Sequence, residues 1–421
     1  MSLILARYLC LSIPLVALLA AARVDRRRAG AGLAFAAAAT GVALFNEISG
    51  QHAFAVVNGA YRGLPLDLWL GWALLWGPIP VLLRNHLPLP VALALLLWLD
   101  ALTMPALEPL LVLGPNWLTG EIIGLLTIAL PAQLLGRWTD DRSQLIPRVL
   151  LQMLVFTTLT LWLVPTVAFT VGDGSWAHLL ALPTGALFLL AQIALVSALP
   201  ALAAVHEFAT RGDGTPFPWD PPRRLVTTGP YAYLANPMQV SAVLLVLLLA
   251  AATHSTVLAG TALATAAFAV AVAGPHERQD MRARYGYQWR DYRAHVRDWW
   301  PRGTPYPGMT AGHVWLDDDC GPCATVRDML IRNGPVHLTI HPASAYRTVL
   351  WRARYEAADG YTLDGAAAVA KALEHTSLLR AYPSWLLIVP GLKPLTQLVV
   401  DALIAPPHPA LPLSGRMDSD E

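Results

Sequence analysis

Long apolar runs recur along the chain from the N-terminus to about residue 274, and a polar sequence follows. Each run approaches the roughly 20 residues that an α-helix needs to cross a bilayer. Nine candidate spans result, near residues 3–22, 29–46, 66–83, 88–104, 118–136, 149–171, 176–204, 238–253 and 255–273. We interpret the first as a span rather than a signal peptide, because no small-residue cleavage site closes it. The pattern therefore predicts a polytopic α-helical membrane protein.

Composition agrees with this prediction and excludes other classes. Only 14% of the residues are charged, whereas soluble proteins have roughly 25%. The 29 basic and 28 acidic residues nearly cancel, so no basic field favours a nucleic-acid partner. Three cysteines in 421 residues exclude a disulfide-stapled scaffold.

Arginines in the short loops predict the orientation, because basic residues accumulate on the cytoplasmic side. They follow the first, third, fifth and seventh spans, at Arg23, Arg26, Arg27, Arg28, Arg84, Arg137, Arg142, Arg148, Arg211, Arg223 and Arg224. Among basic residues, the loops on the opposite side carry almost only Arg62. Arg7, near the predicted outer end of the first span, does not fit this distribution. We expect a cell (inner) membrane protein with its N-terminus outside and its C-terminus in the cytoplasm.

Several polar residues interrupt the apolar runs of the first half, namely Asp67, Asp100, Glu121 and the pair Asn46-Glu47. Ionisable groups inside a membrane mark functional sites by default. We favour the structural alternative, in which they occupy interfacial positions or form helix-to-helix hydrogen bonds. Residues 1–147 form a predicted transmembrane region whose role the sequence does not define.

Two polar segments flank the last pair of predicted spans. The first, 206–239, is rich in proline and contains GPYAYLANPM at 229–238. The second, HERQDMRARYGYQWRDYRAHVRDWWP at 276–301, places aromatic residues at three- and four-residue steps. This spacing predicts a helix with an aromatic stripe on one face, lying at the membrane surface.

These two segments, with a helical hairpin between them, resemble the integral-membrane methyltransferases of the isoprenylcysteine carboxyl methyltransferase and phospholipid methyltransferase type. The resemblance covers residues 148–302, the predicted core domain. It implies S-adenosylmethionine bound at the cytoplasmic face and a lipid or other lipophilic acceptor from the bilayer. His276-Glu277 replaces a common Glu-Glu pair, and no arginine precedes Asn236-Pro237, which argues against a prenylated CaaX cysteine acceptor.

The resemblance also implies roles for individual residues. Tyr231, Tyr233 and Trp289 offer aromatic faces to the sulfonium or the adenine. Glu277 is expected to bind the ribose hydroxyls or the amine of the donor, and Arg278 its carboxylate. Asn236 orients donor or acceptor, which makes it the candidate catalytic residue. The motif residues completing the cofactor-binding set are Gly229, Pro230 and Pro237.

Residues 310–406 have the pattern of a small α/β domain, with a Cys-x-x-Cys pair where a strand passes into a helix. The helix start favours a thiolate at Cys320, the expected attacking thiol, and Cys323 is expected to resolve a mixed disulfide. The neighbouring carboxylates of Asp318 and Asp319 are expected to destabilise that thiolate by charge repulsion. The segment resembles the thioredoxin-like DCC family, named for a D-x-x-C-x-x-C motif that Asp317, Cys320 and Cys323 match. The resemblance implies a redox-active dithiol with a thiol partner.

Other interpretations remain open. In one, the membrane part is only the anchor of a thiol-disulfide oxidoreductase that uses Cys320 and Cys323. In another, both parts form a scaffold without activity. A zinc site would need two further ligands, for which His313 and His341 are available. Pro383 fits either a cis proline facing the cysteines or a trans proline between helices. We expect Cys10 to be an inert apolar side chain, and residues 407–421 to form a disordered tail.

Overall fold

The computed structural model describes residues 2–49, 52–220 and 222–410. The chain divides into two compact units. Unit 1 contains Met1–Leu180, Thr215–Pro221 and Leu249–Leu258, and unit 2 contains Ala181–Gly214, Pro222–Leu248 and Ala259–Glu421. The candidate functional residues from Gly229 to Cys323 all belong to unit 2.

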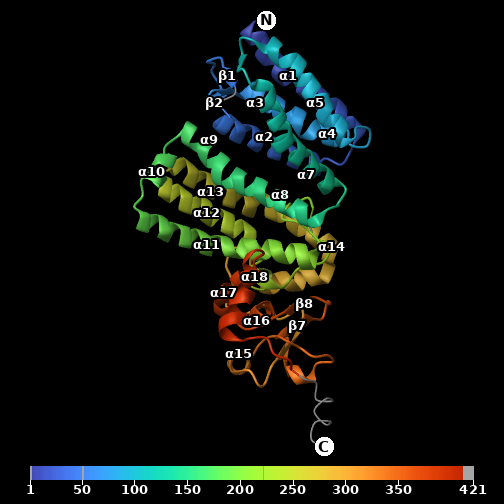
Figure 1. The fold of residues 1–421 in the computed structure, drawn as a ribbon, viewed down its shortest axis with the longest axis vertical. Coiled ribbons are helices and arrows are strands. Elements are labelled where there is room, and N and C mark those ends of the chain that lie inside the picture. Colours follow the sequence, from blue (N-terminus) through green and yellow to red (C-terminus); the bar gives the residue numbers. More distant parts are fainter. Residues whose placement is uncertain (1, 50–51, 221, 411–421) are drawn as a thin grey trace, which may run out of the picture. The chain divides into compact units, whose positions relative to one another are not determined.

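Unit 1 is a bundle of apolar helices with two small antiparallel strand pairs (Figure 1). Its α-helices are α1 (Leu3–Val24), α2 (Ala29–Ser49), α3 (Leu66–Trp76), α4 (Pro78–Leu82), α5 (Leu89–Thr103), α6 (Trp117–Gly124), α7 (Leu130–Asp140), α8 (Leu145–Thr158), α9 (Val164–Val171) and α10 (Trp176–Leu180). The pairs join β1 (His52–Phe54) to β4 (Leu111–Leu113), and β2 (Ala60–Tyr61) to β3 (Leu64–Pro65). A 3-10 turn at Met104–Leu107 and π-helical turns at Leu125–Ala129 and Leu159–Leu163 complete the unit.

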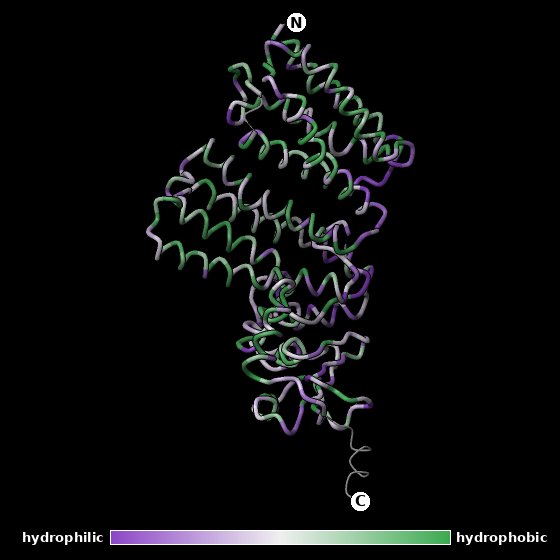
Figure 2. The backbone as a smooth tube through the Cα atoms, viewed as in Figure 1, coloured by the Kyte–Doolittle hydropathy of each residue, from purple (hydrophilic) through white to green (hydrophobic). Residues whose placement is uncertain are grey.

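Apolar helices account for all nine predicted spans. Within the described residues, six stretches are long and apolar enough to cross a membrane: Leu3–Val24, Ala29–Ile48, Leu89–Leu107, Trp117–Asp140, Leu145–Val171 and Thr184–Gly212. The other three, Leu66–Leu82, Pro237–Thr253 and Thr256–Ala271, are apolar but shorter. Figure 2 shows these helices as mainly hydrophobic. The chain is thus a multi-pass helical membrane protein, while the number nine and the orientation stay predictions.

The ionisable residues that interrupt the apolar runs of unit 1 have partners. Arg7 Nε lies 2.5 Å from Asp67 Oδ2, which explains how an arginine is tolerated at the predicted outer end. Trp76 Nε1 donates to Asp100 Oδ2 at 3.2 Å, and Asp100 also forms a hydrogen bond with Glu121. Glu47 pairs with Arg62 at 2.6 Å. These contacts agree with the structural interpretation, in which such groups form hydrogen bonds and ion pairs with polar groups on neighbouring helices and loops.

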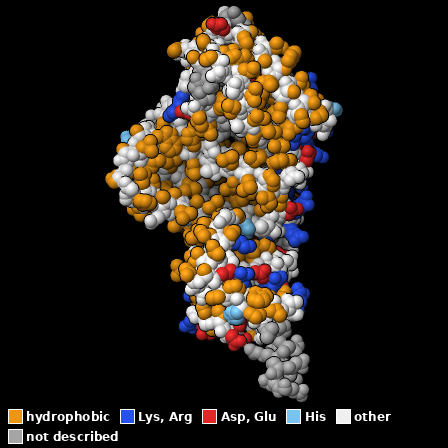
Figure 3. Space-filling model, in the orientation of Figure 1, with side chains coloured by type: hydrophobic (Ala, Val, Ile, Leu, Met, Phe, Trp, Pro, Cys, Tyr) orange, Lys and Arg blue, Asp and Glu red, His pale blue; other side chains and the backbone are white. Residues whose placement is uncertain are grey.

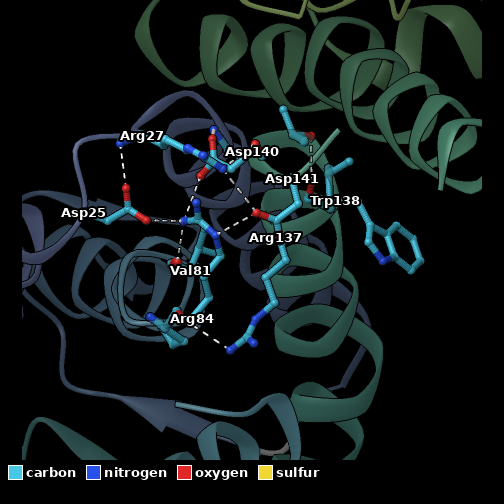
Figure 4. A network of polar contacts seen from close by, with 12 residues as sticks. Asp25, Arg27, Val81, Arg84, Arg137, Trp138, Asp140 and Asp141 are labelled. Atoms are coloured by element: carbon cyan, nitrogen blue, oxygen red, sulfur yellow. Dashed lines mark hydrogen bonds and ion pairs between the residues drawn. The ribbon is translucent and has the colours of Figure 1, made fainter. Parts of the chain in front are cut away.

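Arg84 joins three of the polar segments that the arginine pattern assigns to one side of the membrane. Its buried guanidinium lies 2.9 Å from Asp25, 3.2 Å from Asp140 and 3.3 Å from Asp141 (Figure 4). Arg137 in the same cluster donates to the carbonyl oxygen of Leu87 at 2.9 Å. The network holds these segments together at one end of unit 1.

The membrane part of unit 2 begins with α11 (Thr184–Glu207), which continues as a π-helical turn, Phe208–Gly212. A 3-10 turn, Gly229–Ala232, precedes α12 (Pro237–Thr253). The chain then returns through α13 (Thr256–Phe268), a π-helical turn (Ala269–Ala273) and α14 (Gly274–His295). α14 is broken at Gly286, whose φ of 54° lies outside the helical region.

The aromatic stripe of this segment does not lie on the membrane surface as predicted. Trp289, Tyr292 and Val296 are buried, and they pack with Ala232 and Tyr233. The break at Gly286 and the end of α14 at His295 let the chain fold back onto the preceding loop. Burial of the stripe inside the unit therefore replaces burial in lipid.

The C-terminal domain, residues 312–410, contains one four-stranded sheet. Its elements are β5 (Gly312–Leu316), α15 (Gly321–Arg332), β6 (Leu338–Pro342), β7 (Arg354–Ala357), β8 (Thr362–Asp364), α16 (Ala366–Leu373), α17 (Leu378–Ile388) and α18 (Leu392–Val399), with 3-10 and π-helical turns at Ala343–Ala345 and Val400–Ile404. The strand order is β6-β5-β7-β8, with β5 and β6 parallel and the other pairs antiparallel. The strand and helix predicted on either side of the Cys-x-x-Cys pair are present as β5 and α15.

Two smaller predictions concern the end of the chain. Pro383 lies inside α17, and the cis peptide bond found among the described residues is Glu108-Pro109, so Pro383 is trans. The first residues of the predicted tail contact the domain, since Ala410 N donates to Leu350 O at 2.8 Å. Residues 411–421 of that tail lie outside the described residues.

Candidate functional site

The segment 229–238, here called the GPY loop, is held by backbone hydrogen bonds to the chain that follows α14. Ala235 N donates to Arg297 O at 2.9 Å, and Tyr306 N donates to Ala232 O at 2.8 Å. Asn236 precedes Pro237, which begins α12 where its missing N–H costs nothing. These contacts bring together the two motifs that the sequence placed on either side of the helical hairpin.

A small cavity, here called the loop cavity, lies where the two motifs meet, with about 370 Å³ of empty space when the adjoining open solvent is included. It combines an apolar side from the π-helical turn after α13 with a polar side. Its lining residues are Asn236, Ala269, Val270, Gly274, Glu277, Arg278, Trp289, Asp298 and Trp299. Four of the predicted cofactor-binding residues therefore share one cavity: Asn236, Glu277, Arg278 and Trp289.

Asp298 is the centre of the polar side, although the sequence analysis gave it no role. Its carboxylate accepts from Asn236 Nδ2 at 3.2 Å and pairs with Arg293 at 2.6 Å. Arg278 NH1 lies 3.7 Å away, and its guanidinium is 38% exposed. Asp298 thus orients Asn236 and leaves Arg278 loosely held, so that Arg278 has capacity for another anion.

Trp289 has a buried and unsatisfied donor. Within the described part of the chain, its Nε1–H has no hydrogen-bond partner. Such a group is costly unless something accepts from it. The guanidinium of Arg293 lies 5.7 Å from the centre of the Trp289 ring, so a cation already contacts this aromatic system. Hydrogen bonding is therefore a better-supported role for Trp289 than π contact with a sulfonium.

The Glu277 carboxyl lies at the exposed edge of the loop cavity. Partial desolvation, followed by repulsion from the Asp298 carboxylate, raises its pKa above the usual range. A cationic or hydrogen-bond-donating group in the cavity would stabilise the ionised form. This behaviour fits a residue that receives the amine or the hydroxyls of a ligand.

Gly229, Pro230, Tyr231 and Tyr233 are buried and do not belong to the described lining of the cavity. Pro237, the fifth remaining residue of the predicted set, is also buried and outside this lining. Tyr231 stacks on Phe208 with ring centres 4.8 Å apart. The Tyr231 hydroxyl is buried and has no partner among the described residues. The Tyr233 hydroxyl donates to the carbonyl oxygen of Glu374 in the C-terminal domain at 2.8 Å. The structure thus places these four residues where they shape the loop.

A buried ionic network fastens the GPY loop to the C-terminal domain. Lys371 of α16 forms ion pairs with Glu207 of α11 and, at 2.7 Å, with Glu374. Glu374 also accepts from Gly229 N at 3.2 Å, and Thr228 donates to Glu207 at 2.5 Å. The sequence analysis missed this network. A lysine alone in the apolar run AAAVAKAL, followed three residues later by glutamate, was the available signal.

The cysteine pair has the predicted placement at the start of α15. Cys320 is the buried residue that precedes the helix, and Cys323 lies one turn later. Burial, reinforced by a hydrogen bond with Cys320, raises the pKa of the Cys323 thiol to about 12. Asp318 forms an ion pair with Arg327, which offsets part of the repulsion expected beside Cys320. Cys323 therefore stays protonated until a neighbouring group takes its proton.

The two histidines considered as zinc ligands contact each other instead. His313 Nδ1 and His341 Nε2 are 3.0 Å apart on neighbouring strands β5 and β6. Across the described residues, no group of three or more His, Cys, Asp or Glu side chains is arranged to hold a metal ion. The pair is explained as a cross-strand contact.

Comparison with known protein families finds a match in the membrane part of unit 2. Residues 180–288 match the family described as phospholipid methyltransferase. The matched segment contains α11, the GPY loop, α12, α13 and most of α14, and hence Asn236, Glu277 and Arg278 of the loop cavity. Comparison with curated proteins and with solved structures gives no significant match. The match supports a membrane methyltransferase, and it extends to neither the first 179 residues nor the C-terminal domain.

Proposed function

We propose that this protein transfers a methyl group from S-adenosylmethionine to a lipophilic acceptor, and that the loop cavity holds the donor. The observation that carries the proposal is the convergence of Asn236, Glu277, Arg278 and Trp289 on one cavity, within and next to the segment that matches phospholipid methyltransferases. The proposal places the cavity at the cytoplasmic face of the inner membrane, in agreement with the arginine pattern.

The groups present fit the chemistry of this donor. S-adenosylmethionine supplies an electrophilic methyl group on a sulfonium, together with a carboxylate, an amine, ribose hydroxyls and adenine. Arg278, loosely held by Asp298, is available to bind the carboxylate. Glu277 is placed to accept from the amine or the hydroxyls, and the buried Trp289 N–H to donate to an acceptor atom. No protein nucleophile is required, because alignment and exclusion of water accelerate a direct displacement.

The acceptor is proposed to approach from the apolar side of the cavity. Ala269 and Val270 line it from the π-helical turn that continues the apolar helix α13. Such turns recur at functional sites because they displace one helical register. Asn236, held by Asp298, is proposed to orient the reacting groups. Gly229, Pro230, Tyr231, Tyr233 and Pro237 are proposed to set the loop conformation.

Transfer is tested with membranes that contain the full-length protein and a methyl-labelled donor. Label is expected in the lipid extract, and Asn236→Ala is expected to lower the rate at least tenfold. Gln279→Ala, on the exposed side of α14, is the matched control and should retain wild-type activity. Absence of label in every lipid-soluble product, from a protein that binds the donor, would exclude a lipophilic acceptor.

For the C-terminal domain we propose thiol-disulfide exchange as a second activity. The supporting observation is the position of Cys320 at the N-terminus of α15, in a β-α-β unit whose strands β5 and β6 are parallel. In the proposed step Cys320 attacks a disulfide of a thiol partner, and Cys323 then displaces the partner. The protein dithiol becomes a disulfide, and the partner receives two electrons and two protons.

Full-length protein and Cys320→Ser, each assayed as a reductant of an added disulfide, test this second activity. The wild type should reduce one equivalent, and Cys320→Ser none, while both retain methyl transfer. An oxidoreductase with an inert membrane anchor is less well supported, since the family match falls in the membrane part.

A further inference from the structure

A second cavity, with about 860 Å³ of empty space, lies beside the two cysteines and is here called the dithiol cavity. This figure includes open solvent at the mouth, and the cavity itself has a volume of about 190 Å³. Most of its lining is apolar and comes from α15, the segment before β7, α16, α17 and the chain from α18 onward, including Val326, Leu350, Val369, Leu387, Val400 and Ile404. The cavity is built to hold an apolar ligand.

The polar side chains at the dithiol cavity are already paired. Arg352 forms two hydrogen bonds with Asp401, at 3.0 and 2.7 Å. Gln397 donates to Asp401 at 2.7 Å and accepts from Ala366 N at 2.8 Å. His408 lies 2.5 Å from Asp317. Because these charges neutralise one another, the cavity favours a neutral ligand over a carboxylate or an amine.

The helix that forms one wall of the cavity has an uncovered apolar side. Leu395, Leu398, Val399 and Leu403 are between 42% and 80% exposed. Gln397 and Asp401 lie on the cavity side of the same helical segment. A cluster of exposed aliphatic residues of this kind marks contact with a membrane or a partner. The polar and apolar sides together give the pattern of a helix that lies at a membrane interface.

A contact with α11 indicates that membrane lipid covers this apolar side of the helix. The Tyr382 hydroxyl in α17 donates to the carbonyl oxygen of Val196. That carbonyl lacks its usual intrahelical partner, because the residue four positions later is Pro200. Val196 is near the middle of this span, about 16 Å along the axis from Glu207 at 1.5 Å per residue. A domain that contacts a span at this depth extends into the bilayer.

The arrangement of α17 and α18 agrees with this depth. The two helical segments, Leu378–Ile388 and Leu392–Ile404, meet at 101° and together are apolar enough for a broken span or a re-entrant loop. In Figure 1 α17 lies next to α11, and Figure 3 shows hydrophobic side chains continuing from the apolar helices onto this domain. Trp385 and Ile388 of α17 belong to the same buried cluster as Leu199 and Ala203 of α11.

We propose that α17 and α18 form a re-entrant membrane hairpin, and that the dithiol cavity binds the hydrocarbon chain of a lipid from the leaflet that the hairpin enters. The hairpin brings one wall of the cavity to the bilayer, and the chain enters beside α18. The ligand reaches Cys320 and Cys323 with its apolar part bound between α16 and α18. This inference does not depend on the methyltransferase activity.

Photolabelling of the full-length protein tests lipid binding. The protein is reconstituted into dioleoylphosphatidylcholine vesicles that contain phosphatidylcholine with a diazirine near the end of one acyl chain. After illumination, label is expected on 392–404 and on the cavity residues Val369 and Leu387. Val369→Trp fills the cavity and should lower cavity labelling several-fold, with labelling of α11 unchanged. Val349→Trp, at an exposed valine outside the cavity, is the matched control.

Label on α11 but none on 392–404 would overturn the membrane hairpin. Label on 392–404 with none in the cavity, or cavity label that Val369→Trp does not change, would overturn the lipid site. Cross-links between two copies of the chain through α18 would assign this surface to a protein interface and also overturn the proposal.

A second measurement applies even if Val369→Trp does not fold. A nitroxide is attached at Leu398→Cys or Ile331→Cys in a background without the native cysteines. Both positions are exposed aliphatic residues, but Ile331 belongs to α15. The label at 398 should relax faster with oxygen than with a water-soluble nickel chelate, and the label at 331 should show the reverse. Equal preference for the nickel chelate at both positions would contradict membrane insertion of the hairpin.

Discussion

The backbone N–H of Gly229 donates a hydrogen bond to the Glu374 carboxylate at 3.2 Å, which joins the GPY loop to the C-terminal domain. Lys371 pairs with Glu374 and with Glu207 at the end of α11. Charges buried in this way are stable only as a complete set. The domain is therefore part of the structure that holds the loop, and damage to the network is expected to reach the loop cavity.

Replacement of Lys371 by methionine should be strongly destabilising. It leaves Glu207 and Glu374 buried without their counter-ion, which costs about 3–5 kcal/mol in comparable sites. We expect a clear fall in the thermal unfolding midpoint in detergent, together with weaker donor binding. Lys393→Met, at an exposed position, is the matched control. Equal midpoints for the two variants would contradict a structural role for the network.

Gly229→Ala tests the fit of the GPY loop itself. Gly229 has a φ of +60°, and a Cβ at this position would lie 2.5 Å from Cγ of the buried Glu207. A strained backbone of this kind costs about 1–3 kcal/mol. The variant should unfold at lower temperature and bind the donor more weakly. Gly303 has open space around it, so Gly303→Ala should behave as the wild type. A similar loss of stability and donor binding in Gly303→Ala would contradict a specific requirement for glycine at position 229.

Tyr382→Phe removes the donor to the Val196 carbonyl at the Pro200 position of α11. In the detergent-covered part of the span, an acceptor left without its partner costs about 1–3 kcal/mol, as a buried acceptor does. The thermal midpoint in detergent should fall, and protease should cut the α17–α18 segment sooner. Tyr287→Phe, on an exposed tyrosine, controls for loss of a hydroxyl. Unchanged protease sensitivity of the Tyr382 variant would show that this contact does not hold the domain.

Acidification should destabilise the C-terminal domain through His375. Its ring lies between Val336 O at 2.7 Å and the Tyr355 hydroxyl at 2.9 Å, and burial lowers the pKa to about 4. Between about pH 6.5 and pH 4 the unfolded chain binds a proton that the folded chain does not. Stability should therefore decline over this interval by about 3 kcal/mol. His375→Asn should flatten the pH dependence of the unfolding midpoint, and His295→Asn should not.

Sequence patterns predicted the apolar helices, the pairing of the two motifs and the strand-to-helix position of Cys320. These features depend on local periodicity and turn chemistry, which are encoded within short segments. Asp298, the burial of Tyr233 and the Lys371 network depend instead on contacts between residues more than sixty positions apart. The membrane hairpin was missed because α17 and α18 are individually short, and their exposed side is apparent only after the fold defines what is covered.

Equilibrium binding of radiolabelled S-adenosylmethionine to the purified full-length protein tests the central claim most directly. We expect saturable binding by the wild type and loss of at least tenfold in affinity for Glu277→Ala, because about 1.4 kcal/mol of donor contact is removed. Asp280→Ala, at an exposed carboxylate of the same helix that does not line the cavity, should bind as the wild type does. A well-folded wild-type protein that binds no donor, or equal affinities for all three proteins, would contradict the assignment of the loop cavity as the methyl-donor site.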